Sequence, residues 1–220
     1  MEQIGHIPST SYLIRTSVVV GLAAASFGMA IVSTDELSNT YAHHMDWTTK
    51  TEKSDKTTWI TSASALGLMI GSLLSSTIIK IGRRKSILLA AFVQLIAIGF
   101  QFWLTFWAQV GSKIVFGASS AVQLTACAVY LSETLPPEKV ATYGFAVNLG
   151  VTVGISIQTV IGVFLPDDGK GNLWTLVNFA MLVLCLTNIV LWAMRGESIG
   201  YCVAKEDKEG WREQALKAIS

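Results

Sequence analysis

Six long stretches of the chain contain no charged side chain, a pattern that few folds other than a membrane bundle can accommodate. No Asp, Glu, Lys or Arg occurs within residues 16–34, 57–79, 86–112, 114–132, 140–166 and 171–194. Each stretch has roughly 19 residues or more, enough for a helix to cross a hydrocarbon layer of ~30 Å. Charged residues make up only 14% of the chain, whereas an average soluble domain is about a quarter charged. The pattern predicts an all-α integral membrane protein with a bundle of six transmembrane helices.

The same pattern argues against a soluble helical protein. A large helical core in water would need charged faces on its outer helices, and the six stretches provide none. Only Lys113 separates the third stretch from the fourth, so we expect a very short turn around residues 109–113. The chain therefore divides into a tail over residues 1–15, the bundle over residues 16–194 and a tail over residues 195–220. The second tail has the composition of an amphipathic helix on a membrane surface.

The cations predict the orientation of the bundle. With an even number of helices both termini lie on one side, and eleven Lys and Arg residues fall on that side against five on the other. Loops on the cytoplasmic side of a membrane collect Lys and Arg. We therefore expect both termini on the cytoplasmic side of the membrane or its equivalent, such as a matrix. The charge pattern does not specify which cellular membrane this is.

The second apolar stretch combines tight packing with a basic loop. Small residues recur every four positions, at Ala63, Gly67, Gly71 and Ser75, and four cations follow between residues 80 and 85. At helical spacing the small residues form one narrow strip, along which another helix can approach closely. We expect helix packing through Gly67, Gly71 and Ser75.

One loop contains residue types that bind metals. His43, His44 and Asp46 lie between the first two stretches. Adjacent histidines point to opposite sides of most backbones, and no Cys or Glu completes a ligand set, so a solvated loop is the preferred interpretation. No paired-carboxylate, Ser-His-Asp or phosphate-loop pattern occurs. We expect no metal, no cofactor and no enzymatic activity, and the net charge of +1 argues against a nucleic-acid partner.

Uncharged polar side chains within the apolar stretches are the candidates for function. Gln94 lies in the third stretch, and the fifth carries Asn148 and Thr152 on one helical face with Gln158 beside it. At membrane depth such groups face the interior of a bundle, where they find partners. Two interpretations remain open: hydrogen bonds between helices, or a pocket of neutral donors and acceptors for a sugar or another polyol.

Short motifs follow one another in a fixed order along the chain. They are Phe27-Gly28, Ile-Gly-Arg-Arg-Lys at 81–85, Lys113 with Gly117, Tyr-Leu-Ser-Glu-Thr-Leu-Pro at 130–136, Asn-Leu-Gly-Val-Thr-Val-Gly at 148–154, and Glu197-Ser198. In this order and spacing the chain resembles the N-terminal half of a sugar porter of the major facilitator superfamily. The corresponding family patterns are Phe-Gly-Tyr-Asp, Gly-x-x-x-Asp-Arg-x-Gly-Arg-Arg, Arg with Gly, Tyr-x-x-Glu-x-x-Pro, Gln-Leu-x-Ile-Thr-x-Gly and Pro-Glu-Ser-Pro-Arg.

The resemblance assigns roles to several residues. The inner gate of the family corresponds to Arg83, Arg84, Glu133 and Glu197, and the family's sugar-contacting Gln corresponds to Asn148. Solute contacts are expected from Asn148, Thr152 and Gln158, with Gln94 as a further candidate.

Some family charges are missing from this chain. Ala30 stands where proton-coupled members carry Asp, which puts proton coupling through that position in doubt. Ile79 replaces the Asp of the loop after the second helix, and Val140-Ala141 replace an Arg-Gly pair. Most of the loop cations thus persist, while some of their expected partners do not.

Three interpretations of function follow. The chain resembles half of a transporter, and a second six-helix half, supplied by a second copy or a separate chain, would let it move a hexose-like neutral solute by alternating access. The alternative is a non-transporting accessory subunit of a larger membrane complex, for example a respiratory-chain assembly. A third interpretation is that the sequence is the first part of a longer gene product. In the first two cases a partner must cover the polar face that lipid would otherwise meet.

Overall fold

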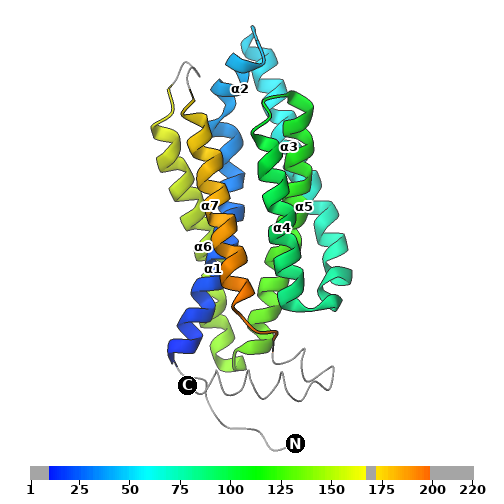
Figure 1. Cartoon of the computed structure of the whole chain (residues 1–220), viewed down its shortest axis with the longest axis vertical. Helices are drawn as coiled ribbons and strands as arrows, with labels where there is room; N and C mark the ends of the chain where they lie inside the picture. The colour runs from blue at the N-terminus through cyan, green and yellow to red at the C-terminus, as the bar shows by residue number, and fades with distance from the viewer. Residues whose placement is uncertain (1–9, 167–171, 199–220) are drawn as a thin grey trace, which may run out of the picture.

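The computed structural model describes residues 10–166 and 172–198, which form helices joined by short connections (Figure 1). Six helices are long and apolar enough to cross a membrane, which confirms the predicted six-helix bundle. No strand occurs in these ranges. The elements are α1 (Thr10–Glu36), α2 (Ser38–His44), α3 (Lys50–Ile78), the 3-10 helix η1 (Ile79–Ile81), α4 (Arg83–Gln101), α5 (Phe106–Thr134), α6 (Pro137–Val163) and α7 (Trp174–Ala193).

The connection between α4 and α5 lies earlier than predicted. α4 ends at Gln101 and α5 begins at Phe106, so the turn covers residues 102–105 and the prediction of 109–113 was wrong. Lys113, the residue that suggested the turn, lies about two turns inside α5 and is only 1% exposed. The charge misled the prediction because acceptors from α1 hold this lysine inside the bundle.

α1 and α3 also begin well before their apolar stretches. α3 begins at Lys50, where an i,i+4 ion pair between Glu52 and Lys56, with 2.6 Å between Oε1 and Nζ, supports the first turns. α1 begins at Thr10, inside the predicted N-terminal tail. The predicted amphipathic tail over residues 195–220 lies outside the described residues, apart from 195–198.

α1 and α5 form the centre of the bundle. Their most apolar windows are 67% and 61% buried, against 28% for α3 with η1 and 22% for α6. α6 packs along α1 and α3 packs along α5, while α4 contacts both α5 and α7. Figure 1 shows α1, α6 and α7 in one group and α3, α4 and α5 in the other. α3 and α6 therefore leave long faces uncovered.

Small residues bring α3 and α5 into backbone contact. A methyl group on Gly67 would overlap the carbonyl oxygen of Ile114, and one on Gly71 would overlap that of Ala118. Ser75, one turn further, is buried and donates its hydroxyl to its own helix. The predicted strip of small residues thus lies against α5.

The pair formed by α1 and α6 has the same construction. A methyl group on Gly150 would overlap the carbonyl oxygen of Gly21, and one on Gly154 would overlap that of Ala25. Dispersion contacts and close backbone approach hold helices together in lipid, where no hydrophobic force acts between them. Two tightly joined helix pairs therefore form the frame of the molecule.

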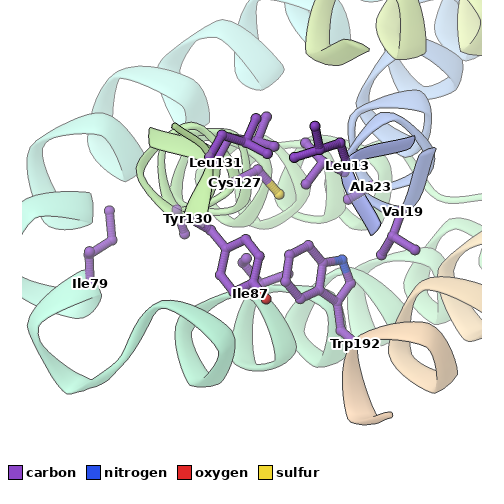
Figure 2. Close-up of a cluster of buried hydrophobic side chains, with 12 residues drawn as sticks. Leu13, Val19, Ala23, Ile79, Ile87, Cys127, Tyr130, Leu131 and Trp192 are labelled. Atoms are coloured by element: carbon purple, nitrogen blue, oxygen red, sulfur yellow. The ribbon is translucent and has the colours of Figure 1, made fainter. Parts of the chain in front are cut away.

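An apolar cluster fills the bundle end at which α4 begins (Figure 2). Tyr130 of α5 and Trp192 of α7 pack edge to face, with ring centroids 5.0 Å apart and an interplanar angle of 86°. Leu13 and Ile87 add contacts from α1 and α4. This cluster joins α1, α4, α5 and α7 next to the basic loop at residues 80–85.

The connection between α1 and α3 is more ordered than the predicted solvated loop. It contains α2, which is anchored by Leu37, Tyr41 and Trp47, all nearly or fully buried. His43 and His44 are exposed, and no group of three potential metal ligands occurs in the described part of the chain. The apolar anchors explain the difference, because they pull the backbone onto the bundle end.

Candidate functional site

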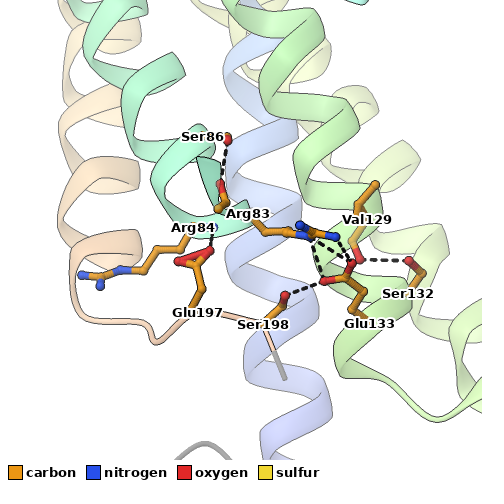
Figure 3. Close-up of polar contacts among 9 residues, drawn as sticks. Arg83, Arg84, Ser86, Val129, Ser132, Glu133, Glu197 and Ser198 are labelled. Carbon is orange, nitrogen blue, oxygen red and sulfur yellow. Dashed lines mark hydrogen bonds and ion pairs between the residues drawn. The ribbon is translucent and has the colours of Figure 1, made fainter. Parts of the chain in front are cut away.

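A polar network joins α4, α5 and the segment after α7 (Figure 3). The Arg83 guanidinium donates from Nε to both oxygens of Glu133, at 2.9 and 3.0 Å, and from Nη2 to Oε1 at 2.5 Å. Ser198 donates its hydroxyl to Oε2 of Glu133 at 2.5 Å. A planar guanidinium that meets a carboxylate through two nitrogens fixes both distance and orientation. The network therefore sets the position of the α5 end relative to the start of α4.

The second arginine of the loop fastens α7. Arg84 donates from Nε to the carbonyl oxygen of Trp192 at 3.1 Å and from Nη2 to that of Ala193 at 2.6 Å. Both carbonyl oxygens lie in the last turn of α7, where the regular hydrogen bonds of an α-helix run out, and that of Trp192 also accepts the backbone N–H of Arg195 at 3.3 Å. Glu197 in turn accepts the backbone N–H of Arg84 at 2.7 Å. The structure thus brings together all four residues of the predicted inner gate: Arg83, Arg84, Glu133 and Glu197.

The positions that lack family charges lie in apolar surroundings. Ile79 is 8% exposed and belongs to the cluster around Tyr130 and Trp192, and Val140 packs against the same cluster. An Asp at position 79 would have to be accommodated among apolar side chains. The basic loop therefore makes its polar contacts with Glu133, Glu197 and the last carbonyl oxygens of α7, and Ile79 contributes apolar packing alone.

Gln94 takes part in hydrogen bonds between helices. It is buried, and its Nε2 donates to Ser120 Oγ at 3.1 Å and to Gln123 Oε1 at 2.7 Å. Both acceptors belong to α5. In this conformation the amide group of Gln94 links α4 to α5.

The candidates on α6 fall into two environments. Asn148 and Thr152 are exposed on the uncovered face of the helix, and Thr152 donates its hydroxyl to the Asn148 carbonyl oxygen at 3.1 Å. Gln158 is fully buried, and neither polar atom of its amide has a partner in the part of the chain that the structure describes. Asn148 and Thr152 are therefore open to a solute or a partner, whereas Gln158 is enclosed.

Sequence reasoning missed a buried cation in the bundle. Lys113 Nζ donates to Ser33 Oγ at 2.6 Å and to the Ala30 carbonyl oxygen at 3.4 Å. The Ser33 hydroxyl itself donates to the Ala30 carbonyl oxygen at 2.9 Å. No carboxylate lies within ion-pair distance of this lysine among the described residues. The signal in the sequence was an isolated Lys between two apolar stretches, a position that fits a membrane-embedded charge as well as a turn.

Comparison with known proteins decides the family. The family model described as "Sugar (and other) transporter" matches residues 13–219. The chain belongs to this sugar transporter family. Proteins of this family are transporters and not enzymes, in line with the expectation from sequence. With six spanning helices, this sugar transporter family member is an integral, multi-pass membrane protein.

Named relatives are all longer than this chain. Hexose transporter 1 of Plasmodium yoelii yoelii is 27% identical over 173 residues, which cover 73% of this chain and 34% of that protein. The D-xylose transporter of Levilactobacillus brevis is 28% identical over 54% of this chain and 26% of its own. Facilitated glucose transporter member 10 of solute carrier family 2, from Xenopus laevis, is 32% identical over 51% of this chain. The chain matches about a third or less of each.

Solved structures share the fold of this sugar transporter family member. The major facilitator superfamily proton:xylose symporter XylE bound to 6-bromo-6-deoxy-D-glucose superimposes with a TM-score of 0.78 at 16% identity, over 96% of this chain and 50% of that one. A structure of the xylose transporter XylE from E. coli in a partially occluded, inward-open conformation gives a TM-score of 0.75 at 16% identity. The resemblance to the N-terminal half of a sugar porter of that superfamily is thereby confirmed.

Proposed function

We propose that the chain is one half of an alternating-access transporter for a hexose-like neutral solute, active when paired with a second six-helix half. The main support is the uncovered face of α6, where Asn148 and Thr152 are exposed together with Ser156. Amide and hydroxyl groups at membrane depth are costly against lipid. A solute pathway bounded by a second half gives these groups water and ligand to bind.

The partner in this proposal covers the exposed faces of α3 and α6. These helices flank the central pair, α5 and α1, and both are largely uncovered. A second body that bridges them would enclose a path along α1 and α5. The second half is a second copy of this chain, a separate six-helix chain or a further part of the same polypeptide.

Within the pathway, Asn148 and Thr152 contact the solute. Arg83 with Glu133, and Arg84 with Glu197, hold the end of the bundle that faces the cytoplasm or matrix. This orientation rests on the excess of cations at that end. A glycosylation site inserted beside His43 would become modified in this orientation, and a site that stays unmodified in a glycosylating membrane would contradict it.

Uptake of a labelled sugar tests the transport proposal. The purified chain, alone and together with a co-expressed six-helix partner, is reconstituted into proteoliposomes with D-glucose or D-xylose as the probe. We expect saturable uptake that requires the paired assembly. Failure of every pairing to produce saturable flux would contradict the proposal.

Matched threonines identify the pathway. Thr152 on α6 and Thr187 on α7 are both exposed, and each donates its hydroxyl to the carbonyl oxygen four residues earlier. Thr152→Val should lower uptake several-fold, roughly the loss of one hydrogen bond to the solute, whereas Thr187→Val should leave uptake unchanged. Equal effects of the two changes would place the pathway elsewhere.

A second candidate function is that of a non-transporting accessory subunit of a larger membrane complex. This candidate is favoured by Ile79, which is buried in the apolar cluster around Tyr130 and Trp192. A bundle that does not move needs no gating charge at that position. Migration in mild detergent separates the two proposals. Stable co-migration with a large complex, without sugar flux, supports the accessory role, and migration as a monomer or plain dimer argues against it.

A further inference from the structure

An apolar groove runs between α4 and α5, beside the turn that joins them at the bundle end opposite the Arg83–Glu133 network. Figure 1 shows the two helices side by side. The walls of the groove are one face of each helix, with Ile96 and Phe100 from α4 and Ala108, Gly111 and Val115 from α5. Its volume is about 610 Å³, within the range of ~300–1,000 Å³ that is typical of small-molecule sites. A methyl group on Gly111 would meet no other part of the chain within 4 Å, so the groove is open above this glycine.

Neither the groove nor the turn beside it carries a charge. No Asp, Glu, Lys or Arg occurs within residues 86–112, and the turn with the start of α5 reads Phe-Trp-Leu-Thr-Phe-Trp at 102–107. Trp103 and Trp107 border the groove and are 68% and 77% exposed. Tryptophan is enriched where a membrane meets water, because its ring prefers an apolar medium and its N–H a polar one. The two indoles therefore place this turn at the membrane boundary.

A third tryptophan marks the same height on α3. Gly67 of α3 meets Ile114 of α5, and the two helices run in the same direction. Trp59 and Trp107 each lie about two turns before this contact, and Trp59 is also exposed, at 66%. The groove thus begins at the membrane boundary. From there it extends along α5 to Val115 for about 12 Å, at 1.5 Å per residue, into the region of the hydrocarbon chains.

The mouth of the groove presents neutral hydrogen-bond donors. The indole N–H groups of Trp103 and Trp107 and the hydroxyl group of Thr105 make no hydrogen bond within residues 10–166 and 172–198. Deeper in the groove, Ser112 donates its hydroxyl to the Gln109 carbonyl oxygen of its own helix. The groove is therefore apolar along its length, and its free donors are gathered at the boundary.

These properties fit a membrane phospholipid. Its acyl chains are apolar, and its ester carbonyl oxygens, which only accept hydrogen bonds, lie at the boundary between the chains and water. Water does not satisfy the groove, whose walls offer it too few polar partners. A sterol brings one hydroxyl group to three donors, and a charged headgroup finds no opposite charge among the lining residues.

We propose that the groove between α4 and α5 binds one acyl chain of a diacyl glycerophospholipid, whose ester carbonyl oxygens accept hydrogen bonds from Trp103 and Trp107. The chain lies over Gly111 and gives α4 and α5 the dispersion contacts that an empty groove would lack. The site selects the lipid by its chain and esters and not by the charge of its headgroup. It does not depend on the transport proposal.

Photocrosslinking of a retained lipid tests the site. The purified chain is loaded in nanodiscs with a phosphatidylcholine that carries a diazirine on one acyl chain, moved into lipid-free detergent to remove loosely held lipid, and irradiated. We expect crosslinks on the α4 and α5 residues of the groove. Gly111→Leu fills the groove and should abolish them. Gly99→Leu is the matched control, because Gly99 is exposed on α4 and also has open space around it.

Both leucine variants should remain folded, since leucine favours a helix more than glycine does, and thermal unfolding checks this. Trp103→Phe keeps an aromatic ring but removes the indole N–H. It should lower lipid retention about fivefold, the loss of one neutral hydrogen bond. Trp59→Phe, at the same height outside the groove, should leave retention unchanged.

Competition with unlabelled lipids tests the chemistry of the occupant. Phosphatidylcholine and phosphatidylglycerol should displace the probe equally well, and cholesterol should do so more weakly. Four results would each overturn the assignment. They are no retained lipid on the wild-type chain, equal crosslinking of the two leucine variants, equal retention by Trp103→Phe and Trp59→Phe, and stronger displacement by cholesterol or by phosphatidylglycerol than by phosphatidylcholine.

Discussion

Lys113 is a buried cation whose nearest acceptors are neutral. Its ammonium group is held by the Ser33 hydroxyl and the Ala30 carbonyl oxygen of α1. Burial of a charge without an opposite charge costs free energy that neutral hydrogen bonds offset only in part. This contact is therefore both a link between α1 and α5 and a source of instability.

A double-mutant cycle measures the link. Ser33→Ala should lower the free energy of unfolding by about 1–3 kcal/mol, because it removes an acceptor from a buried ammonium group. In a Lys113→Met background the same change should cost almost nothing, since no charge then needs the hydroxyl. Thermal unfolding of the four proteins in one detergent gives the coupling. Equal costs of Ser33→Ala in both backgrounds would show that the lysine does not depend on Ser33.

The contribution of Glu133 to stability can be measured against that of Glu138, a nearby acid without comparable contacts. Glu133 accepts from Arg83 and Ser198, whereas Glu138 in the first turn of α6 is exposed. Glu133→Gln should lower stability by about 1–2 kcal/mol, a modest value because the pair is partly exposed. Glu138→Gln should stay within about 0.5 kcal/mol of the wild type. A Glu133 variant as stable as the Glu138 variant would show that the network contributes little.

At the scale of the element, the fit between α3 and α5 depends on glycine. Gly71→Ala should lower the unfolding free energy by about 1–3 kcal/mol, because its methyl group must displace the α5 backbone at Ala118. Gly99 of α4 has open space around the corresponding position, so Gly99→Ala should be neutral or stabilising by up to about 1 kcal/mol. Thermal unfolding compares the two. A Gly71 variant as stable as the Gly99 variant would mean that the helices have room to separate.

The helices themselves were largely predictable from sequence. Lipid excludes charge, so stretches without charged residues located all six spans, and the four-residue spacing of small side chains marked the face of α3 that meets α5. Helix ends were less predictable. The first turns of α3 are stabilised by a local ion pair outside the membrane, and the α4–α5 turn was misplaced because Lys113 finds its acceptors 80 residues away in sequence.

The candidate site was predictable only in part. Residue types and order pointed to Arg83, Arg84, Glu133 and Glu197, which the structure brings together. Sequence alone left two interpretations open for the polar residues of the helices, since an exposed amide and a bonded amide look the same. The structure separates Gln94, which bonds to α5, from Asn148, which is exposed.

For the whole molecule, the polar face of α6 should meet water in the functional assembly. Cys127 and Cys185 are buried, so in a Cys202→Ser background a new cysteine can be labelled selectively. A cysteine introduced by Thr152→Cys should react with a membrane-impermeant maleimide. One introduced by Thr187→Cys should react much more slowly, because α7 lies outside the path that we propose along α1 and α5, between α3 and α6. Similar labelling rates at both positions would contradict an aqueous path along α6.

The backbone contacts at Gly71 and Gly154 have a mechanical consequence. Helices in direct main-chain contact cannot slide or rotate past each other without collision, and Arg84 fastens the end of α7 to the start of α4. We therefore expect the six helices to move together as one rigid body and not independently of one another. Any large displacement has to occur at the outer surfaces of α3 and α6, so the rate of such a motion depends on what the partner presents there.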